Sequence, residues 1–157
     1  MAPPPMPPMA PAPGQMAVAG ARPTGATVIS VIEGIIGVLA LLAGLLFMVG
    51  MSVVGGLANN QPNAQGLGGV FAGVGIVFGV IIILIGLLYL AIAYGVWKAR
   101  SWSWMLGMIV SIIAIVFGVL GLSGGVSVGS IISLALPIIV VYFLWQPEVK
   151  RWLGRPA

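Results

Sequence analysis

The chain lacks cysteine, histidine and aspartate, and it carries little charge of either sign. Without cysteine or histidine it can form no disulfide, no zinc site of the Cys/His type, and no thiol or imidazole catalytic centre. Charged residues make up 5% of the 157 residues, and Glu33 and Glu148 are the only two acids. With so few reactive side chains, we expect no enzymatic activity, no cofactor and no metal centre.

Hydrophobic residues, by contrast, make up 61% of the chain. A soluble domain of this size could not hide so much apolar surface, because the buried fraction of the surface rises only slowly with chain length. Such a composition is typical of a protein that is solvated by lipid. The sequence therefore predicts an integral membrane protein whose main partner is the lipid bilayer, and it does not favour nucleic-acid binding.

Four long apolar segments are the main feature of the chain. Each can cross a hydrocarbon core of ~30 Å, which requires about 20 helical residues, and helices satisfy their own backbone hydrogen bonds in lipid. The expected spans cover residues 27–54, 70–97, 104–122 and 126–145. The sequence therefore predicts an all-α membrane protein in which residues 27–146 form an antiparallel four-helix transmembrane bundle.

The two ends differ from this apolar domain. Residues 1–26 are rich in Pro and Met, which predicts a disordered arm on the cytoplasmic side. Two further uses of the arm stay open: docking of a partner through its prolines, and Cu(I) binding by the thioethers of Met1, Met6, Met9 and Met16. Residues 147–157 predict a short interfacial tail, in which a helix starting at Pro147 would lie on the membrane surface.

The basic residues and the tryptophans indicate the orientation in the membrane. All six basic residues fall on one side of a four-span topology: Arg22, Lys98, Arg100, Lys150, Arg151 and Arg155. The positive-inside rule makes this side cytoplasmic, so both termini are expected inside the cell membrane. The five tryptophans map to the same boundary, where indole rings favour the headgroup level. The expected interface anchors are Trp97, Trp102, Trp104, Trp145 and Trp152.

Small residues recur along each span at helical spacing. In lipid, such residues let helix backbones approach closely, so they are expected to carry the packing of the bundle or of a homo-oligomer. The candidate packing positions are Gly37, Gly44, Gly75, Gly79, Gly86, Gly107, Ser111, Ala114 and Gly118. In the fourth span, Pro137 lacks the N–H that would bond the carbonyl of Ser133, so a kink is expected there.

Glu33 is the one acid inside an apolar segment. It lies about 9 Å into the helix if that helix begins near residue 27, because each residue adds 1.5 Å. Three uses are open. It can form a structural ion pair with Lys98 or Arg100, it can hold a proton for coupled transport, or it can contact a partner or a lipid headgroup.

Parts of the chain resemble a group of small prokaryotic four-span membrane proteins. The stretch "AYGVWKARSWSW" has the aromatic-Gly-hydrophobic-basic corner and the Trp-rich start of the third span of that group, and "PEVKRW" matches its closing motif. The resemblance covers residues 27–153 and implies the same bundle and topology. The group has no assigned activity, so the resemblance implies no site residues.

Two functions are compatible with these patterns. The first is a non-enzymatic structural or accessory component of a membrane assembly, since the chain has few polar groups and no recognisable site. The alternative is a small proton-coupled transporter or channel that uses Glu33. From sequence alone the first is preferred, because the other spans lack an evident polar relay for ion or proton movement.

Overall fold

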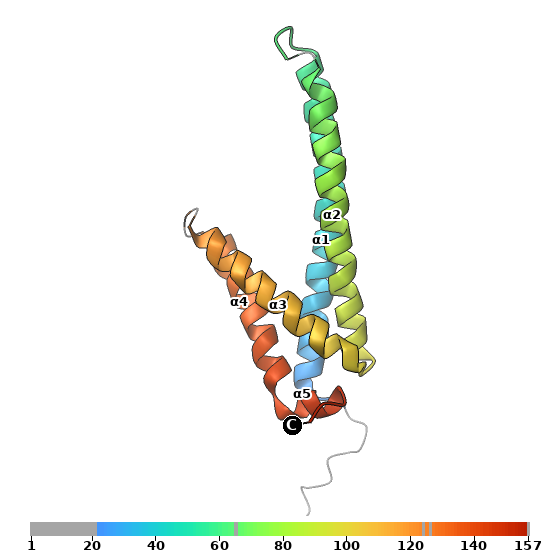
Figure 1. Ribbon diagram of the computed structural model, residues 1–157, viewed down its shortest axis with the longest axis vertical. Helices are drawn as coiled ribbons and strands as arrows, with labels where there is room; N and C mark the ends of the chain where they lie inside the picture. Colours follow the sequence, from blue (N-terminus) through green and yellow to red (C-terminus); the bar gives the residue numbers. More distant parts are fainter. Residues whose placement is uncertain (1–21, 65, 124, 126, 157) are drawn as a thin grey trace, which may run out of the picture.

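The computed structural model describes residues 22–64, 66–123, 125 and 127–156, and its regular structure in these ranges is entirely helical (Figure 1). The helices are α1 (Thr24–Asn59), α2 (Leu67–Trp97), α3 (Ser101–Leu122), α4 (Val128–Trp145) and α5 (Pro147–Trp152). The first four are long and apolar enough to cross a membrane. The chain is therefore an all-α, multi-pass membrane protein built on four antiparallel helices, which confirms the predicted fold class.

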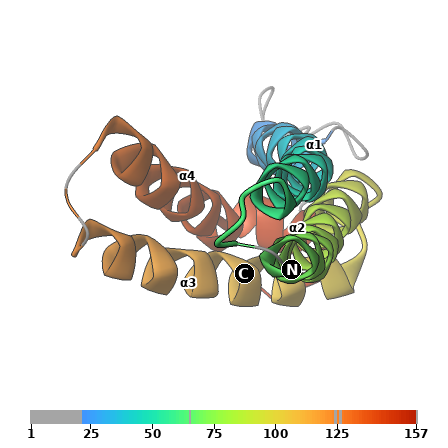
Figure 2. The same cartoon turned by 90° about the horizontal axis from the view of Figure 1, so that it is seen from above.

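The four long helices form two antiparallel hairpins, α1–α2 and α3–α4. The hairpins meet at one end of the molecule, where α5 also lies, and they diverge toward the two loops that join their helices (Figures 1 and 2). We call this shared end the base; it contains the start of α1, the corner between α2 and α3, and α5. The bundle is therefore closed at the base and forked beyond it.

Glycine permits the close approach of α1 and α2 along most of their length. A Cβ on Gly37 would lie 3.0 Å from the carbonyl oxygen of Gly86, and one on Gly44 would lie 2.9 Å from that of Gly79. Backbone-to-backbone contact of this kind is the usual role of small residues in membrane helices. These four glycines thus serve the α1–α2 hairpin itself rather than a single interior shared by all four helices.

The two hairpins differ in length. At 1.5 Å per residue, α1 and α2 are about 54 and 46 Å long, whereas α3 and α4 are about 33 and 27 Å long. A hydrocarbon core is ~30 Å thick, so only the second hairpin matches it without a large tilt. The longer hairpin must either tilt strongly or extend past the far side of the core.

Both ends of the predicted transmembrane domain require correction. Helix α1 begins at Thr24 rather than near residue 27, and Gly25 and Ala26 are buried in the base, so the end of the predicted arm is helical. Helix α5 does form at Pro147, but its apolar side chains do not face lipid. Val149 and Leu153 are fully buried in the core, because α5 folds across the base and packs against α1.

The corner between α2 and α3 has a well-defined backbone structure. The N–H of Arg100 donates to the carbonyl of Gly95 at 2.8 Å, and the N–H of Ala99 donates to that of Val96 at 3.3 Å. These two bonds form a Schellman motif, which closes a helix through one left-handed residue. Here that residue is Ala99, with a φ of 55°. The short corner fixes the second hairpin against the first at the base.

Candidate functional site

A cavity of about 410 Å³ lies between the two hairpins, just beyond the base. All four long helices contribute to its lining, which is mostly apolar. Its polar groups come from a different helix each: Glu33 from α1, Tyr89 from α2, Ser111 from α3 and Ser133 from α4. Mostly apolar walls with a few convergent polar groups are typical of small-molecule sites in helix bundles.

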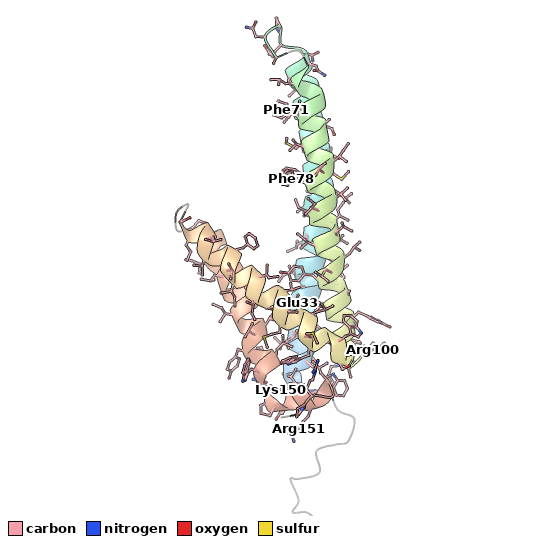
Figure 3. The ribbon with its side chains drawn as sticks, viewed as in Figure 1. Glu33, Phe71, Phe78, Arg100, Lys150 and Arg151 are labelled. Atoms are coloured by element: carbon pink, nitrogen blue, oxygen red, sulfur yellow. The ribbon has the colours of Figure 1, made fainter. Side chains whose placement is uncertain are left out.

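Glu33 is the only charged group in the lining of this cavity. Its side chain is 1% exposed, and its Oε2 atom is buried and accepts no hydrogen bond from any described residue. Figure 3 shows it inside the molecule, above the base. A buried carboxylate without a partner is strongly unfavourable, so this position demands a proton, a cation or a hydrogen-bond donor.

The ion pair considered for Glu33 is not formed. Lys98 and Arg100 lie in the corner beyond the end of α2 and are exposed, and none of the described residues makes an ion pair within 4.0 Å. One reason is depth. Because α1 begins at Thr24, Glu33 lies about 14 Å along the helix instead of about 9 Å. The corner cations therefore stay at the base, as Figure 3 shows for Arg100.

Three of the polar groups of the cavity lie at similar depth. At 1.5 Å per residue, each of the following lies about 12–15 Å along its helix from the base: Glu33, Tyr89 and Ser111. Pro137 lies at this depth in α4, whereas Ser133 lies about 18 Å along that helix. Sequence reasoning did not connect Tyr89 with Glu33. The available signal was that both lie about eight or nine residues from the base ends of antiparallel neighbouring helices, which places them side by side.

Pro137 removes one backbone hydrogen-bond donor from the same region. It lies inside α4 and is buried against the cavity, and it cannot donate to the carbonyl of Ser133, which also lines the cavity. The hydroxyl of Ser133 donates to the carbonyl of Ser130 at 3.0 Å. The cavity region therefore contains the Glu33 carboxyl, whose Oε2 has no described donor, and a Ser133 carbonyl to which Pro137 cannot donate.

The remaining packing candidates divide between the two hairpins. Gly75 and Gly79 lie against Met51 and Met48 of α1. In α3, a Cβ on Gly107 would lie 3.3 Å from Leu144, and one on Gly118 would lie 3.1 Å from Leu134, so both face α4. Ser111 and Ala114, which lie between these two glycines in the sequence, line the cavity instead.

The five predicted interface anchors fall into two groups. Trp97, Trp102 and Trp145 are 41–63% exposed at the base, as expected for residues at a membrane boundary. Trp104 and Trp152 are partly buried, and each donates its indole N–H to a carbonyl in the last turn of another helix. Trp104 bonds Leu144 at 3.1 Å, and Trp152 bonds Val96 at 3.2 Å. The Trp104 indole thus satisfies a helix-end carbonyl, and the Trp152 indole adds a second donor to the Val96 carbonyl, which also accepts from the N–H of Ala99.

No model of a known protein family, no curated protein and no solved structure matches this chain. The resemblance to small prokaryotic four-span proteins therefore stays a prediction. The interpretations of the Pro/Met-rich arm also stay predictions, because residues 1–21 lie outside the described part of the chain.

Proposed function

We propose that this membrane protein is a small, non-enzymatic, proton-coupled transporter in which Glu33 is the coupling group. The observation that carries the proposal is the buried, unpartnered carboxyl of Glu33 at a cavity lined by all four helices. Intramembrane acids that face a bundle interior mark ion pathways and proton relays in many pumps and transporters. This reverses the order of preference that the sequence alone suggested.

The reason for the reversal is the arrangement of polar groups. The sequence offered no polar relay, because the hydroxyl-bearing residues are isolated within their own helices. In the folded chain, Tyr89 and Ser111 line the same cavity as Glu33, and Ser111 is 2% exposed. A carboxyl in such a setting can hold a proton or a cation, but one carboxyl cannot satisfy both, and this exclusion is the physical basis of coupled exchange.

The cavity also suggests how a substrate would enter. Phe117 lines it and is 69% exposed, so the cavity opens at the side of the molecule, between α3 and the neighbouring hairpin. In a membrane this opening faces lipid. We therefore expect small apolar compounds, including lipophilic cations, to reach Glu33 from the bilayer.

The test is proton flux in liposomes that contain the purified full chain. With a pH gradient imposed and ethidium as the probe compound, we expect ethidium movement coupled to a change in lumenal pH. The Glu33→Gln substitution keeps the size of the side chain but removes the titratable group, so coupled flux should fall at least about tenfold, a common cost of losing an essential proton-transfer group. Glu148→Gln is the matched control, because Glu148 is the other acid and is exposed at the base.

Two outcomes would contradict the proposal: flux no greater than in empty liposomes, or equal flux in the wild type and the Glu33→Gln variant. If the Gln variant gives no folded protein, Glu33→Asp replaces it. This variant keeps a carboxyl one methylene shorter, and we expect reduced but measurable flux. Wild-type flux in the Glu33→Asp variant would also count against a coupling role, because a coupling carboxyl should be sensitive to its position.

The structural or accessory role remains the second candidate, and the length of the α1–α2 hairpin favours it. Many apolar side chains near its loop are exposed, including Val53, Leu57 and Val70, each at 58–63%. If the hairpin extends past the hydrocarbon core, another protein surface is needed to cover them. Folded protein without any Glu33-dependent flux would support this role.

We also infer that the base faces the cytoplasm and that the membrane is the cell membrane. The support is that all six basic residues belong to segments of the base, while the two distal loops carry no charge.

A further inference from the structure

The base has an excess of positive charge that the chain does not neutralise. Its segments carry all six basic residues but only one acid, Glu148. The other acid, Glu33, lies inside the bundle, and residues 1–21 contain no acid in their sequence. Among the described residues no ion pair within 4.0 Å forms. Most of the counter-charge of the base must therefore come from outside the chain.

Arg22 is held in a fixed position at the base. Its guanidinium carbon lies 3.5 Å from the centroid of the Trp97 ring, and its Nη2 donates to the carbonyl of Trp97 at 3.3 Å. Its Nε is buried and finds no acceptor among the described residues. A guanidinium that is stacked and oriented in this way keeps unused donors in a fixed geometry.

Arg155 repeats this arrangement on another indole. Its guanidinium carbon lies 5.2 Å from the centroid of Trp104, and its backbone N–H donates to Lys150 at 2.8 Å. Trp104 is itself held by its bond to the carbonyl of Leu144. The Nε of Arg155 is also buried without an acceptor in the described chain. Two oriented guanidinium groups with unmatched donors thus lie at the same end of the molecule.

Two other cations of the base differ. Lys98 and Arg100 are exposed, and their side chains make no hydrogen bond or ring contact with any residue that the structure describes. They add to the general positive potential but offer no fixed geometry. Comparing Arg22 and Arg155 with Lys98 and Arg100 therefore distinguishes binding at a site with defined ligands from general electrostatic attraction.

We propose that the base binds the headgroups of anionic phospholipids, with the guanidinium groups of Arg22 and Arg155 as ligands of the phosphate oxygens. The planar guanidinium fork matches phosphate geometry, and the Nη groups of both arginines, unlike their buried Nε atoms, remain open to an anion from outside the chain. The ligand is a lipid because the exposed indoles of Trp97, Trp102 and Trp145 place the base at the headgroup level. The acyl chains would then lie along the apolar outer surfaces of the helices.

The test is quenching of tryptophan fluorescence by brominated lipids, added to the full-length protein in neutral detergent micelles. Brominated phosphatidylglycerol should quench saturably and at lower concentration than brominated phosphatidylcholine. Arg22→Gln and Arg155→Gln should each weaken phosphatidylglycerol binding by about fivefold or more, since each removes an oriented fork. Lys98→Gln and Arg100→Gln remove the same charge from exposed positions and should weaken binding by less than about twofold.

Equal losses in all four Gln variants would overturn the proposal, because diffuse charge would then explain the binding. Displacement of the brominated phosphatidylglycerol by millimolar inorganic phosphate would also overturn it, since the site would then prefer a soluble anion. Arg22→Lys and Arg155→Lys keep the charge and lack the planar guanidinium fork, and they decide the case if the Gln variants do not fold. We expect weaker binding in both; unchanged affinity would count against guanidinium ligands. The proposal is independent of transport by Glu33.

Discussion

Ala99 is the residue on which the corner between the hairpins depends. Its left-handed backbone, with a φ of 55°, is a conformation that glycine adopts freely and that costs alanine about 1 kcal/mol or more. The Schellman bonds on either side hold it in place. The "KARS" segment gave no hint of this strain, because the sequence has no glycine at the position where most such helix ends carry one.

The Ala99→Gly substitution should therefore stabilise the protein. We expect a gain of about 0.5–1 kcal/mol, since the relief of strain exceeds the added freedom of the unfolded chain. The measurement is the midpoint of thermal unfolding in detergent. Ala91→Gly, at an exposed position within α2, is the control and should lose about 1 kcal/mol through helix propensity. A loss of similar size at both positions would argue against a left-handed Ala99.

At the residue scale, the sequence indicated that Glu33 matters but gave the wrong setting for it. The depth of Glu33 along α1 was underestimated because nothing in "ARPTGATV" marks the helix start clearly. Pro and Thr are both acceptable at the start of a helix. The carboxyl therefore lies beyond the corner cations. Similarly, the composition placed Trp104 at the membrane boundary, but only the folded chain identifies the carbonyl to which it donates.

At the element scale, the α1–α2 hairpin depends on backbone contact rather than on large side chains. A Cβ on Gly44 would lie 2.7 Å from Ile83 and 2.9 Å from the carbonyl oxygen of Gly79. On the same helix, a Cβ on Gly50 would have nothing within 4 Å. The two glycines therefore provide a matched pair, one in the interface and one outside it.

Gly44→Ala should destabilise the hairpin, whereas Gly50→Ala should not. The added methyl at residue 44 must push the two helices apart, at a cost of about 1–3 kcal/mol typical of overpacking. At residue 50 the methyl meets no neighbour, so better helix propensity should leave stability unchanged or slightly higher. Unfolding midpoints of the two variants in the same detergent check this. Equal midpoints would show that α1 and α2 are not in contact at Gly44.

The elements themselves were largely predictable, and their ends less so. Long apolar runs identify membrane helices because a single segment in lipid must satisfy its own backbone hydrogen bonds, which a helix does. All four predicted spans are present. Helix α4 begins at Val128, because Ser127 accepts from the N–H of Ser130 and the Ser130 hydroxyl accepts from the N–H of Ser127 in a capping box. The predicted start, residue 126, lies outside the described residues. The burial of α5 could not be read from its amphipathic pattern, which fits a lipid surface or a protein surface equally well.

At the scale of the whole molecule, the basic residues, the indoles and the ends of the described chain gather at the base, while the two loops lie at the opposite ends of the hairpins (Figure 1). The sequence predicted this segregation from the order of the basic residues alone. It could not predict the fork between the hairpins, because the spacing of small residues does not tell which helix each stripe will face. The cavity at Glu33 is a consequence of that fork.

The orientation can be tested with single cysteines, since the natural chain has none to give background labelling. Asn63 lies in the loop of the long hairpin and Pro156 lies after α5, and both are exposed. With a membrane-impermeant maleimide on intact cells, the Asn63→Cys variant should be labelled at once. The Pro156→Cys variant should be labelled only after permeabilisation. The opposite pattern would place the base outside and would contradict the positive-inside assignment.

The gathering of all five tryptophans at the base has a practical consequence. In vesicles with a single protein orientation, every tryptophan of the chain lies near the same leaflet. A soluble collisional quencher such as iodide, added to only one compartment, would therefore dim either most of the emission or very little of it. The unmodified protein thus reports its own sidedness after each reconstitution, without any introduced label.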